Sequence, residues 1–314
     1  MLPPDTTSPP AGEEKPVLRS GAIGQGKVLV GDVLAGLAAA GISGEPMFAQ
    51  PDLMCLRRRV ADGFCYFVAN RSETNAFHGW LPLARAAREI VLMDPLTGRV
   101  GMGACRQNQS SRPEVRLILG PGQSVILRCR SAAGGTEPKW ESRIPTGPSV
   151  ALEGTWNIRF VEGGPELPSP RQTARLGSWT DLGDTNTQRF AGTACYSLRF
   201  DAPPPHAGRW ELDLGRVCQS ARVRLNGTDL GTLFVAPFRV TVDALKANDN
   251  QLEIEVTSTA ANRIRDLDRR GVVWRNFHDI NFVNLQYKPF DAADWPVTDA
   301  GLLGPVTLTP VVAE

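Results

Sequence analysis

A long succession of short strand-like runs, beginning near residue 54, constrains the fold of this chain more than any other feature. The runs are rich in β-branched, aromatic and aliphatic residues, and Gly, Pro, Asn and Asp separate them. Runs of this length between turn residues are typical of antiparallel β-sheets. In the first half of the chain the expected strands are residues 56–60, 64–69, 90–93, 114–119 and 124–129.

The second half continues this pattern after a segment rich in Gly, Pro, Ser and Thr. Asn226-Gly227 lies between two strand-like runs, and this dipeptide favours the positive φ angles of a type I′ hairpin turn. Many short strands with few helices are typical of a sandwich or a jelly roll. The expected strands are residues 155–161, 192–200, 209–214, 220–225, 229–233, 238–242, 251–257 and 306–311.

The N-terminal part of the chain differs from the rest. Residues 1–18 are rich in Pro, Thr, Ser and Glu, which cannot bury a core, so we expect a disordered tail. A strand-like run at residues 26–30 is followed by Asp32, a good N-cap, and by a helical pattern over residues 33–40 that Gly41 ends. The predicted divisions are a tail (1–18), a short α/β remnant (19–50), a small β-sandwich (51–132), a linker (133–150) and a jelly roll (151–314).

Charge and hydropathy exclude several classes of function. The formal net charge is +1, so the chain has no global field that favours nucleic acid or an acidic membrane. No apolar run approaches the roughly 20 residues that span a bilayer. The first residues lack a basic stretch followed by an apolar one, so no signal peptide is expected. Cytoplasmic location is the default, and a periplasmic or secreted parent protein stays open.

The cysteines favour a reduced, metal-free protein. None of them forms a CxxC pair, and no Cys/His cluster has zinc spacing. Several lie in apolar strand-like runs, where a free thiol behaves as a small hydrophobic group. We therefore expect buried free thiols rather than a disulfide framework, and no metal or cofactor. The six residues are Cys55, Cys65, Cys105, Cys129, Cys195 and Cys218.

Three groups of segments carry a resemblance to a known family. The first is YFVANRS at 66–72 with DPLTG at 94–98, and the second is LGSWTD at 176–181 with FAGTACY at 190–196. The third is ARVRLNGTDLGTL at 221–233, followed by PFRV at 237–240, NQLEI at 250–254, Asn262-Arg263 and GLLGPV at 301–306. Together they resemble the C-terminal half of glycoside hydrolase family 106, the bacterial α-L-rhamnosidases, over most of residues 19–314. The third group also resembles the galactose-binding-like jelly roll of β-galactosidase-type enzymes.

The resemblance implies a mostly β chain whose small β-sandwich precedes a galactose-binding-like jelly roll. In that family the barrel with the catalytic carboxylates lies N-terminal to the matching region, and here only the Pro-rich start precedes it. The family's catalytic residues therefore have no counterpart positions in this sequence. The implied function is a non-catalytic accessory region that supports a catalytic barrel on another chain or binds plant or bacterial glycan, such as rhamnose-containing glycan, for it.

Two other functions stay open. The chain could be a glycosidase in its own right, which requires two carboxylates about 5–10 Å apart across a sugar. It could instead be a structural or interaction domain without sugar binding, which predicts an exposed apolar patch. The candidate acids for the glycosidase are Glu153, Glu162, Glu166, Asp181 and Asp184.

Five residues are candidates for contact with a sugar. The ring of Trp179 could stack on a sugar while Asp181 accepts from its hydroxyls, although the same pair could close the jelly roll and cap a turn. Arg239 could face a ligand or pair with a buried carboxylate. Trp274 and His278 lie in a long aromatic segment, residues 260–299, that shows no clear periodicity and could wall a sugar cleft. His278 could equally be a structural histidine.

Overall fold

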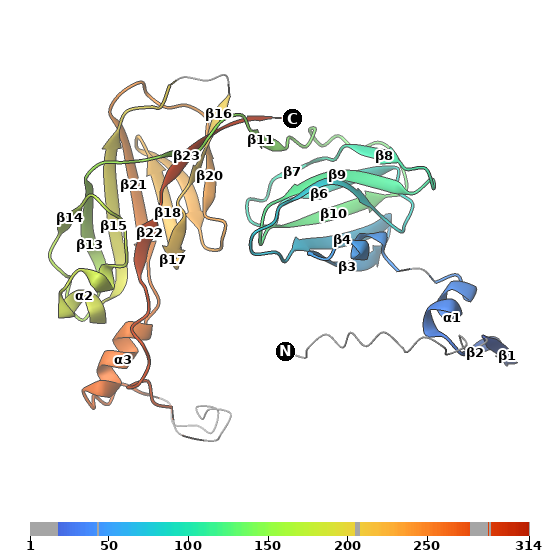
Figure 1. Ribbon diagram of the computed structural model, residues 1–314, viewed down its shortest axis with the longest axis horizontal. Coiled ribbons are helices and arrows are strands. Elements are labelled where there is room, and N and C mark those ends of the chain that lie inside the picture. The colour runs from blue at the N-terminus through green and yellow to red at the C-terminus, as the bar shows by residue number, and fades with distance from the viewer. Residues whose placement is uncertain (1–17, 43, 205–207, 277–287, 289, 314) are drawn as a thin grey trace, which may run out of the picture. The chain divides into compact units, whose positions relative to one another are not determined.

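The computed structural model describes residues 18–42, 44–204, 208–276, 288 and 290–313. The chain is mostly β, with antiparallel pairing in its sheets, which confirms the predicted fold class (Figure 1). It divides into two compact units. The first comprises Met1–Arg71, His78–Leu117 and Ser124–Lys139, and the second comprises Ser72–Phe77, Ile118–Gln123 and Trp140–Glu314.

The described N-terminal residues form a hairpin followed by a short helix. Strands β1 (Arg19–Ile23) and β2 (Gly26–Val30) pair antiparallel, and α1 (Val33–Ala39) follows. The Asp32 carboxylate accepts a 2.7 Å hydrogen bond from the Ala35 amide, which confirms the predicted N-cap. The sequence predicted the second strand and the helix but not β1. A single turn of 3-10 helix, η1 (Pro46–Ala49), precedes the next strand.

Two sheets make up the β-sandwich of the first unit. The strand order of the larger sheet is β3-β4-β10-β6-β7, and that of the smaller sheet is β5-β9-β8. The larger sheet comprises β3 (Leu53–Val60), β4 (Gly63–Asn70), β10 (Ser124–Arg130), β6 (Glu89–Met93) and β7 (Val100–Met102). The smaller comprises β5 (Phe77–Pro82), β9 (Pro113–Leu119) and β8 (Cys105–Gln107). Along β10 every second residue is buried, as expected for a strand with one face on a core.

Gly103 lies where the two sheets of this sandwich approach each other. A Cβ atom on Gly103 would lie 2.1 Å from Cδ1 of Leu92, in the larger sheet, and 3.1 Å from Cγ2 of Val115, in the smaller. The absence of a side chain at this position therefore allows the apolar faces of the two sheets to pack closely.

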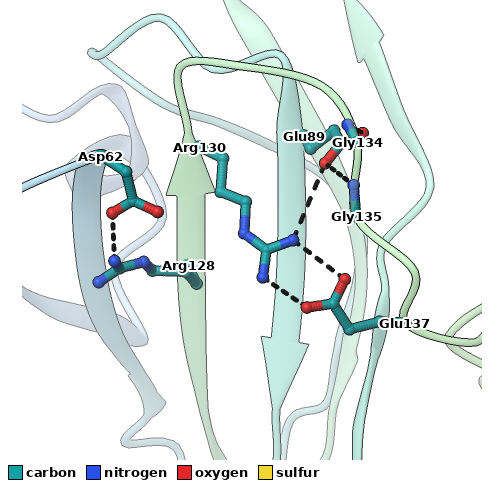
Figure 2. A network of polar contacts seen from close by, with 7 residues as sticks. All are labelled: Asp62, Glu89, Arg128, Arg130, Gly134, Gly135 and Glu137. Atoms are coloured by element: carbon teal, nitrogen blue, oxygen red, sulfur yellow. Dashed lines mark hydrogen bonds and ion pairs between the residues drawn. The ribbon is translucent and has the colours of Figure 1, made fainter.

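Residues 133–139, within the segment predicted to be a linker, are bound to the first unit (Figure 2). The Glu89 carboxylate accepts hydrogen bonds from the amides of Gly134 (2.8 Å) and Gly135 (3.0 Å). Arg130 Nη1 donates to Glu137 Oε2 at 3.0 Å, and Nη2 donates to Oε1. This bond from Arg130 holds the pKa of the Glu137 carboxyl below its usual range.

A sandwich of two larger sheets forms the second unit. One sheet has the order β11-β23-β16-β20 with β12 also paired to β23, and the other has the order β14-β13-β15-β21-β18-β19. The first sheet comprises β11 (Arg143–Pro145), β23 (Thr307–Ala313), β16 (Arg209–Asp213), β20 (Arg239–Val242) and β12 (Val150–Ala151). The six-stranded sheet comprises β14 (Arg171–Thr173), β13 (Trp156–Gly164), β15 (Ala191–Phe200), β21 (Asn250–Thr257), β18 (Ser220–Leu225) and β19 (Thr228–Leu233). A separate pair is formed by β17 (Arg216–Cys218) and β22 (Gly301–Gly304).

Strands β11 and β12 lie at the end of the predicted linker. Their pairing with β23 makes residues 143–145 and 150–151 part of the second unit. The predicted hairpin turn at Asn226-Gly227 is confirmed, because φ is +52° at Asn226 and +82° at Gly227 and the flanking residues Leu225 and Thr228 pair.

A helix occupies part of the segment that the sequence suggested was an irregular loop. Helix α3 (Ala261–Arg269) follows β21 and packs against the short helix α2 (Thr185–Arg189). Arg263 and Arg270 both pair with Asp266, at i,i+3 and i,i+4 spacing, with distances of 2.9 and 3.3 Å. Ile264 and Leu267 recur at helical spacing, but the helix is short and most of its residues are polar, so the sequence analysis missed it. Within the described ranges no helix is both long and apolar enough to cross a membrane.

Candidate functional site

Trp179 lies in the core of the second unit. It begins the 3-10 turn η2 (Trp179–Asp181), and its side chain is fully buried. The ring centroid lies 5.6 Å from that of Phe160 and 5.6 Å from that of Phe190, in edge-on arrangements. An indole in this position packs on other aromatic rings and presents no face to solvent, whereas Asp181 of the same turn is exposed.

Backbone contacts with the residues before β22 hold this turn in place. Ser178 Oγ accepts a hydrogen bond of 3.0 Å from the Ala300 amide, and the Trp179 amide donates to the Ala300 carbonyl at 2.9 Å. Gly301 has φ of +100°, and a Cβ there would lie 2.8 Å from Cε3 of Trp179. The local sequence therefore builds a tight contact around the indole rather than a cleft.

Arg239 lies on the other sheet and bridges two strands. Its Nε donates to Oδ2 of Asp213 at 2.7 Å, and its Nη1 is 3.5 Å from Oε1 of Glu211. Burial raises the pKa of the Glu211 carboxyl, and the Arg239 charge opposes that effect. Arg239 therefore links β20 to β16 through ion pairs. This is the structural role that the sequence analysis considered for Arg239.

Trp274 follows α3 and is bound by a buried carboxylate. Its indole Nε1 donates to Asp268 at 2.7 Å, and Arg275 and the Ala292 amide donate to the same carboxylate at 3.0 and 2.8 Å. Burial alone would raise the pKa of Asp268, but these hydrogen bonds hold it below its usual range. The Arg275 guanidinium also lies 5.2 Å from the ring centre of Phe290.

The predicted sugar contacts are therefore distributed over separate places. Trp179 is in the core, Arg239 bridges β16 and β20, and Trp274 lies beyond α3. His278 lies outside the described residues.

Two of the candidate acids, Asp184 and Glu166, each lie near an arginine. Asp184 caps α2 by accepting from the Asn186 amide, and it lies 3.4 Å from Arg171. Glu166 lies 3.8 Å from Arg189. Of three hollows on the surface of the described residues, none is lined by two of the five acids.

One of these hollows is lined by amide, hydroxyl, carboxylate and guanidinium groups, and it lies on the outer face of the six-stranded sheet. Its volume is about 490 Å³, and it spans β14, β13, β15 and β21, which follow one another in that sheet (Figure 1). We call Cys195 and Ser197 its floor, since they have short side chains and come from β15, between β13 and β21. The lining includes Asn157, Arg159, Gln172, Cys195, Ser197 and Glu253.

Strand register places these side chains in two adjacent rows across the sheet. One row runs from Gln172 through Asn157 and Ser197 to Glu253, each residue being the partner of the next. Arg159 is paired with Cys195 in the neighbouring row. Because alternate residues of a strand share a face, both rows lie on the side opposite the core.

Two charges in this hollow lack an ionic partner. Within the described residues, no ion pair joins Arg159 or Glu253 to another side chain, and Glu253 accepts one hydrogen bond of 3.3 Å from Gln251 Nε2. Asn157 Oδ1 accepts from Gln172 Nε2 at 2.7 Å. Burial raises the pKa of the Cys195 thiol, with Glu253 adding to the effect, so the floor is uncharged at neutral pH.

The sequence analysis missed these residues. Period-two alternation indicates that Asn157 and Arg159 share a face, and that Cys195 and Ser197 share one. It does not reveal which strands are neighbours, so the assembly of the hollow was not visible. In the described part of the chain, no group of three or more His, Cys, Asp or Glu side chains could hold a metal ion.

Comparisons with known proteins find similarity to glycoside hydrolases. No protein-family model matches it. It is 30% identical to a protein of Formosa agariphila named putative beta-glucuronidase, in an alignment covering 65% of this chain and 19% of that protein. It is 26% identical to the solved rhamnosidase from Novosphingobium sp. PP1Y, with a TM-score of 0.66, over 94% of this chain and 27% of that one. The chain thus spans less than a third of the length of each relative.

Proposed function

We propose that the chain is a non-catalytic, carbohydrate-associated accessory region of an α-L-rhamnosidase-type glycoside hydrolase. In this proposal it corresponds to the C-terminal portion of a family 106 enzyme, and its second unit is a galactose-binding-like jelly roll. It supports, or binds glycan for, a catalytic barrel that these residues do not include. Rhamnose-containing plant or bacterial glycan is the proposed ligand.

The observation that carries the proposal is the likeness to the rhamnosidase. It extends over 94% of this chain at 26% identity and a TM-score of 0.66, so it includes both units rather than one widespread sandwich. A shared fold alone does not transfer a function, so the proposal also draws on the site. The polar hollow on the six-stranded sheet offers amide, hydroxyl, carboxylate and guanidinium groups, which match the hydrogen-bonding needs of sugar hydroxyls.

The arrangement of acids favours binding over hydrolysis. Hydrolysis by the usual mechanism needs two carboxylates facing one sugar. Glu153 lines a hollow with Asp201 and Asp249, but Asp249 forms two hydrogen bonds, of 2.6 and 2.7 Å, with Arg199. Glu162 lies on an exposed position of β13. These placements support an accessory role for the described residues.

Two assays on one purified sample test the proposal. Calorimetry with L-rhamnose and with rhamnose-containing pectic oligosaccharides measures binding, and release of the aryl group from an aryl α-L-rhamnoside measures hydrolysis. Saturable binding without turnover is the expected result. Turnover well above that of a mock-purified control would contradict the accessory role.

A specific surface also favours the supporting part of this role. Exposed apolar side chains gather on the hairpin and helix at residues 19–42, where Ile23, Val30, Val33 and Leu34 are between 62% and 76% exposed. An isolated two-stranded hairpin is marginally stable in water. We propose that this surface packs on the catalytic domain of the same hydrolase. Binding of a hydrophobic dye, lost when Val33 and Leu34 are changed to Ser, is expected. A chain that binds no dye and stays monomeric would contradict it.

A further inference from the structure

We propose that the hollow on the six-stranded sheet binds an acidic glycan, and that Arg159 takes the carboxylate of a uronic acid residue. The inference rests on the proposed carbohydrate-associated function and adds to it the location of the site and the chemical class of the ligand. Its support comes from charge, register and shape on one face of one sheet.

The charge argument starts from the arginines that share this face. Arg222 donates to Asp229 at 2.6 Å, and Arg224 donates to Glu255 at 2.9 Å, so both have a carboxylate partner within the sheet. Among the described residues Arg159 has no such partner, although it lies in the same row as Glu255. A guanidinium presents a planar pair of donors that matches a carboxylate, so a ligand carboxylate is the complement that this position lacks.

The remaining polar groups suit the hydroxyls of the same ligand. Ser197 lies between Asn157 and Glu253 in the row across the strands. Neighbouring strands are about 4.8 Å apart, so the row offers hydrogen-bonding groups at intervals similar to the width of a sugar ring. A carboxylate such as Glu253 accepts from hydroxyl groups, and the amides of Asn157 and Gln172 can both donate and accept.

Shape separates this hollow from the rest of the sheet face. The floor residues Cys195 and Ser197 have short side chains, whereas the surrounding Arg159, Arg171 and Glu253 are long. Arg171 lies 3.4 Å from Asp184, which directs its charge toward α2. In this hollow, Arg159 is therefore the positively charged side chain that can bind an anionic ligand.

Calorimetry on the full chain tests the proposal with two matched probes, an oligogalacturonate and the same oligosaccharide after reduction of its carboxyl groups. We expect the acidic probe to bind more tightly, and added NaCl to weaken it. Arg159→Gln should lower the affinity for the acidic probe by about tenfold or more and remove the preference, because a charge-assisted hydrogen bond is lost. Glu253→Gln should weaken the binding of the reduced, neutral probe, because a charged acceptor for its hydroxyl groups is lost.

Two further variants keep the test interpretable. Ser197→Leu fills the floor and should abolish binding of both probes, while Arg222→Gln, on the same face but outside the hollow, should leave both affinities unchanged. A circular dichroism spectrum and a thermal unfolding curve like those of the wild type show that each variant is folded.

The possible failures differ from one another. Equal binding of the two probes, or full retention of binding in Arg159→Gln, would overturn the role of Arg159. Glycan binding that none of the hollow variants changes would overturn the location of the site and leave the proposed function standing. Absence of binding to every probe, rhamnose-containing ones included, would overturn the glycan-binding part of the proposed function as well.

Discussion

The indole nitrogen of Trp274 donates a 2.7 Å hydrogen bond to the buried carboxylate of Asp268. Arg275 and the Ala292 amide donate to the same carboxylate. The Asp268 side chain of α3 therefore joins Arg275 to Ala292, which lies 17 positions later in the chain. Asn262 adds a second connection, since its side chain donates to the Thr298 carbonyl at 2.8 Å. Trp274, Ala292 and Thr298 are therefore held to α3 by polar side chains of the helix.

Removing the Asp268 carboxylate should loosen these segments. Asp268→Ala leaves Arg275 and the Trp274 indole without their acceptor, and losing a hydrogen bond to a charged group costs about 1.5–3 kcal/mol. We expect faster amide hydrogen exchange at residues 270–276 and 290–295, together with a lower melting temperature. Asp294→Ala, at an exposed carboxylate in the same segment, is the matched control. Unchanged exchange in Asp268→Ala would contradict the role of this carboxylate.

The same carboxylate makes stability depend on pH in the acidic range. The folded pKa of Asp268 lies below its usual value, so its stabilising effect is complete above the unfolded pKa, about 3.9. The effect is lost as pH falls through the lower folded pKa. We therefore expect the melting temperature of the wild type to fall more steeply than that of Asp268→Asn between about pH 5 and about pH 2. Parallel curves would show that Asp268 does not contribute.

Much of the fold was predictable because strands leave a local signal. Alternating burial in β10 and the Asn226-Gly227 turn both reflect short-range rules, and both appear in the structure as expected. Helix α3 was not predicted, because it is stabilised by ion pairs and by tertiary hydrogen bonds such as those of Asn262. The hydrogen bonds between Asn262 and Thr298 join residues that are far apart in the sequence, and local periodicity does not report such contacts.

The site was less predictable than the fold for the same reason. Trp179 belongs to a motif that suits both a sugar platform and a core residue, and its contacts with Phe160 and Phe190 are tertiary. The hollow around Arg159 and Ser197 needs the order of four strands, which no single segment encodes. Local sequence therefore indicated the chemistry of individual side chains but not which of them would meet.

The close approach at Gly103 should be sensitive to a single added methyl group. Gly103→Ala places a Cβ 2.1 Å from Cδ1 of Leu92 and 3.1 Å from the Ile90 carbonyl oxygen, so the Leu92 side chain or the backbone around it has to shift. Overpacking of this kind costs about 1–3 kcal/mol. Chemical denaturation of the variant should show that loss, whereas Gly21→Ala, where the Cβ meets nothing within 4 Å, should unfold near the wild-type midpoint. Equal midpoints for both variants would contradict the packing argument.

The contacts of Arg130 and Glu89 should protect residues 131–139 from proteases. Arg130 pairs with Glu137, and Glu89 binds the Gly134 and Gly135 amides (Figure 2). Glu89→Ala frees both amides, so we expect faster cleavage within residues 131–139 under limited proteolysis. Asp62→Ala, which removes the nearby partner of Arg128 but no contact of this segment, is the control. Equal cleavage rates in the two variants would contradict the tether.

Substitution of Trp179 separates its two possible roles. Its indole is fully buried between Phe160 and Phe190, so Trp179→Ala should destabilise the second unit by about 3–5 kcal/mol. Trp295→Ala, at a tryptophan that is 38% exposed, should cost less. Denaturation curves followed by circular dichroism measure both changes.

Glycan binding by the same variants gives the decisive comparison. A core residue affects binding only through folding, so the fraction of Trp179→Ala that is folded should bind glycan with wild-type affinity. Trp179→Phe keeps an aromatic ring in the core and should recover much of the stability without changing that affinity. If Trp179→Ala were as stable as the wild type but bound no glycan, the indole would instead contact the sugar, and the core position would not describe its role.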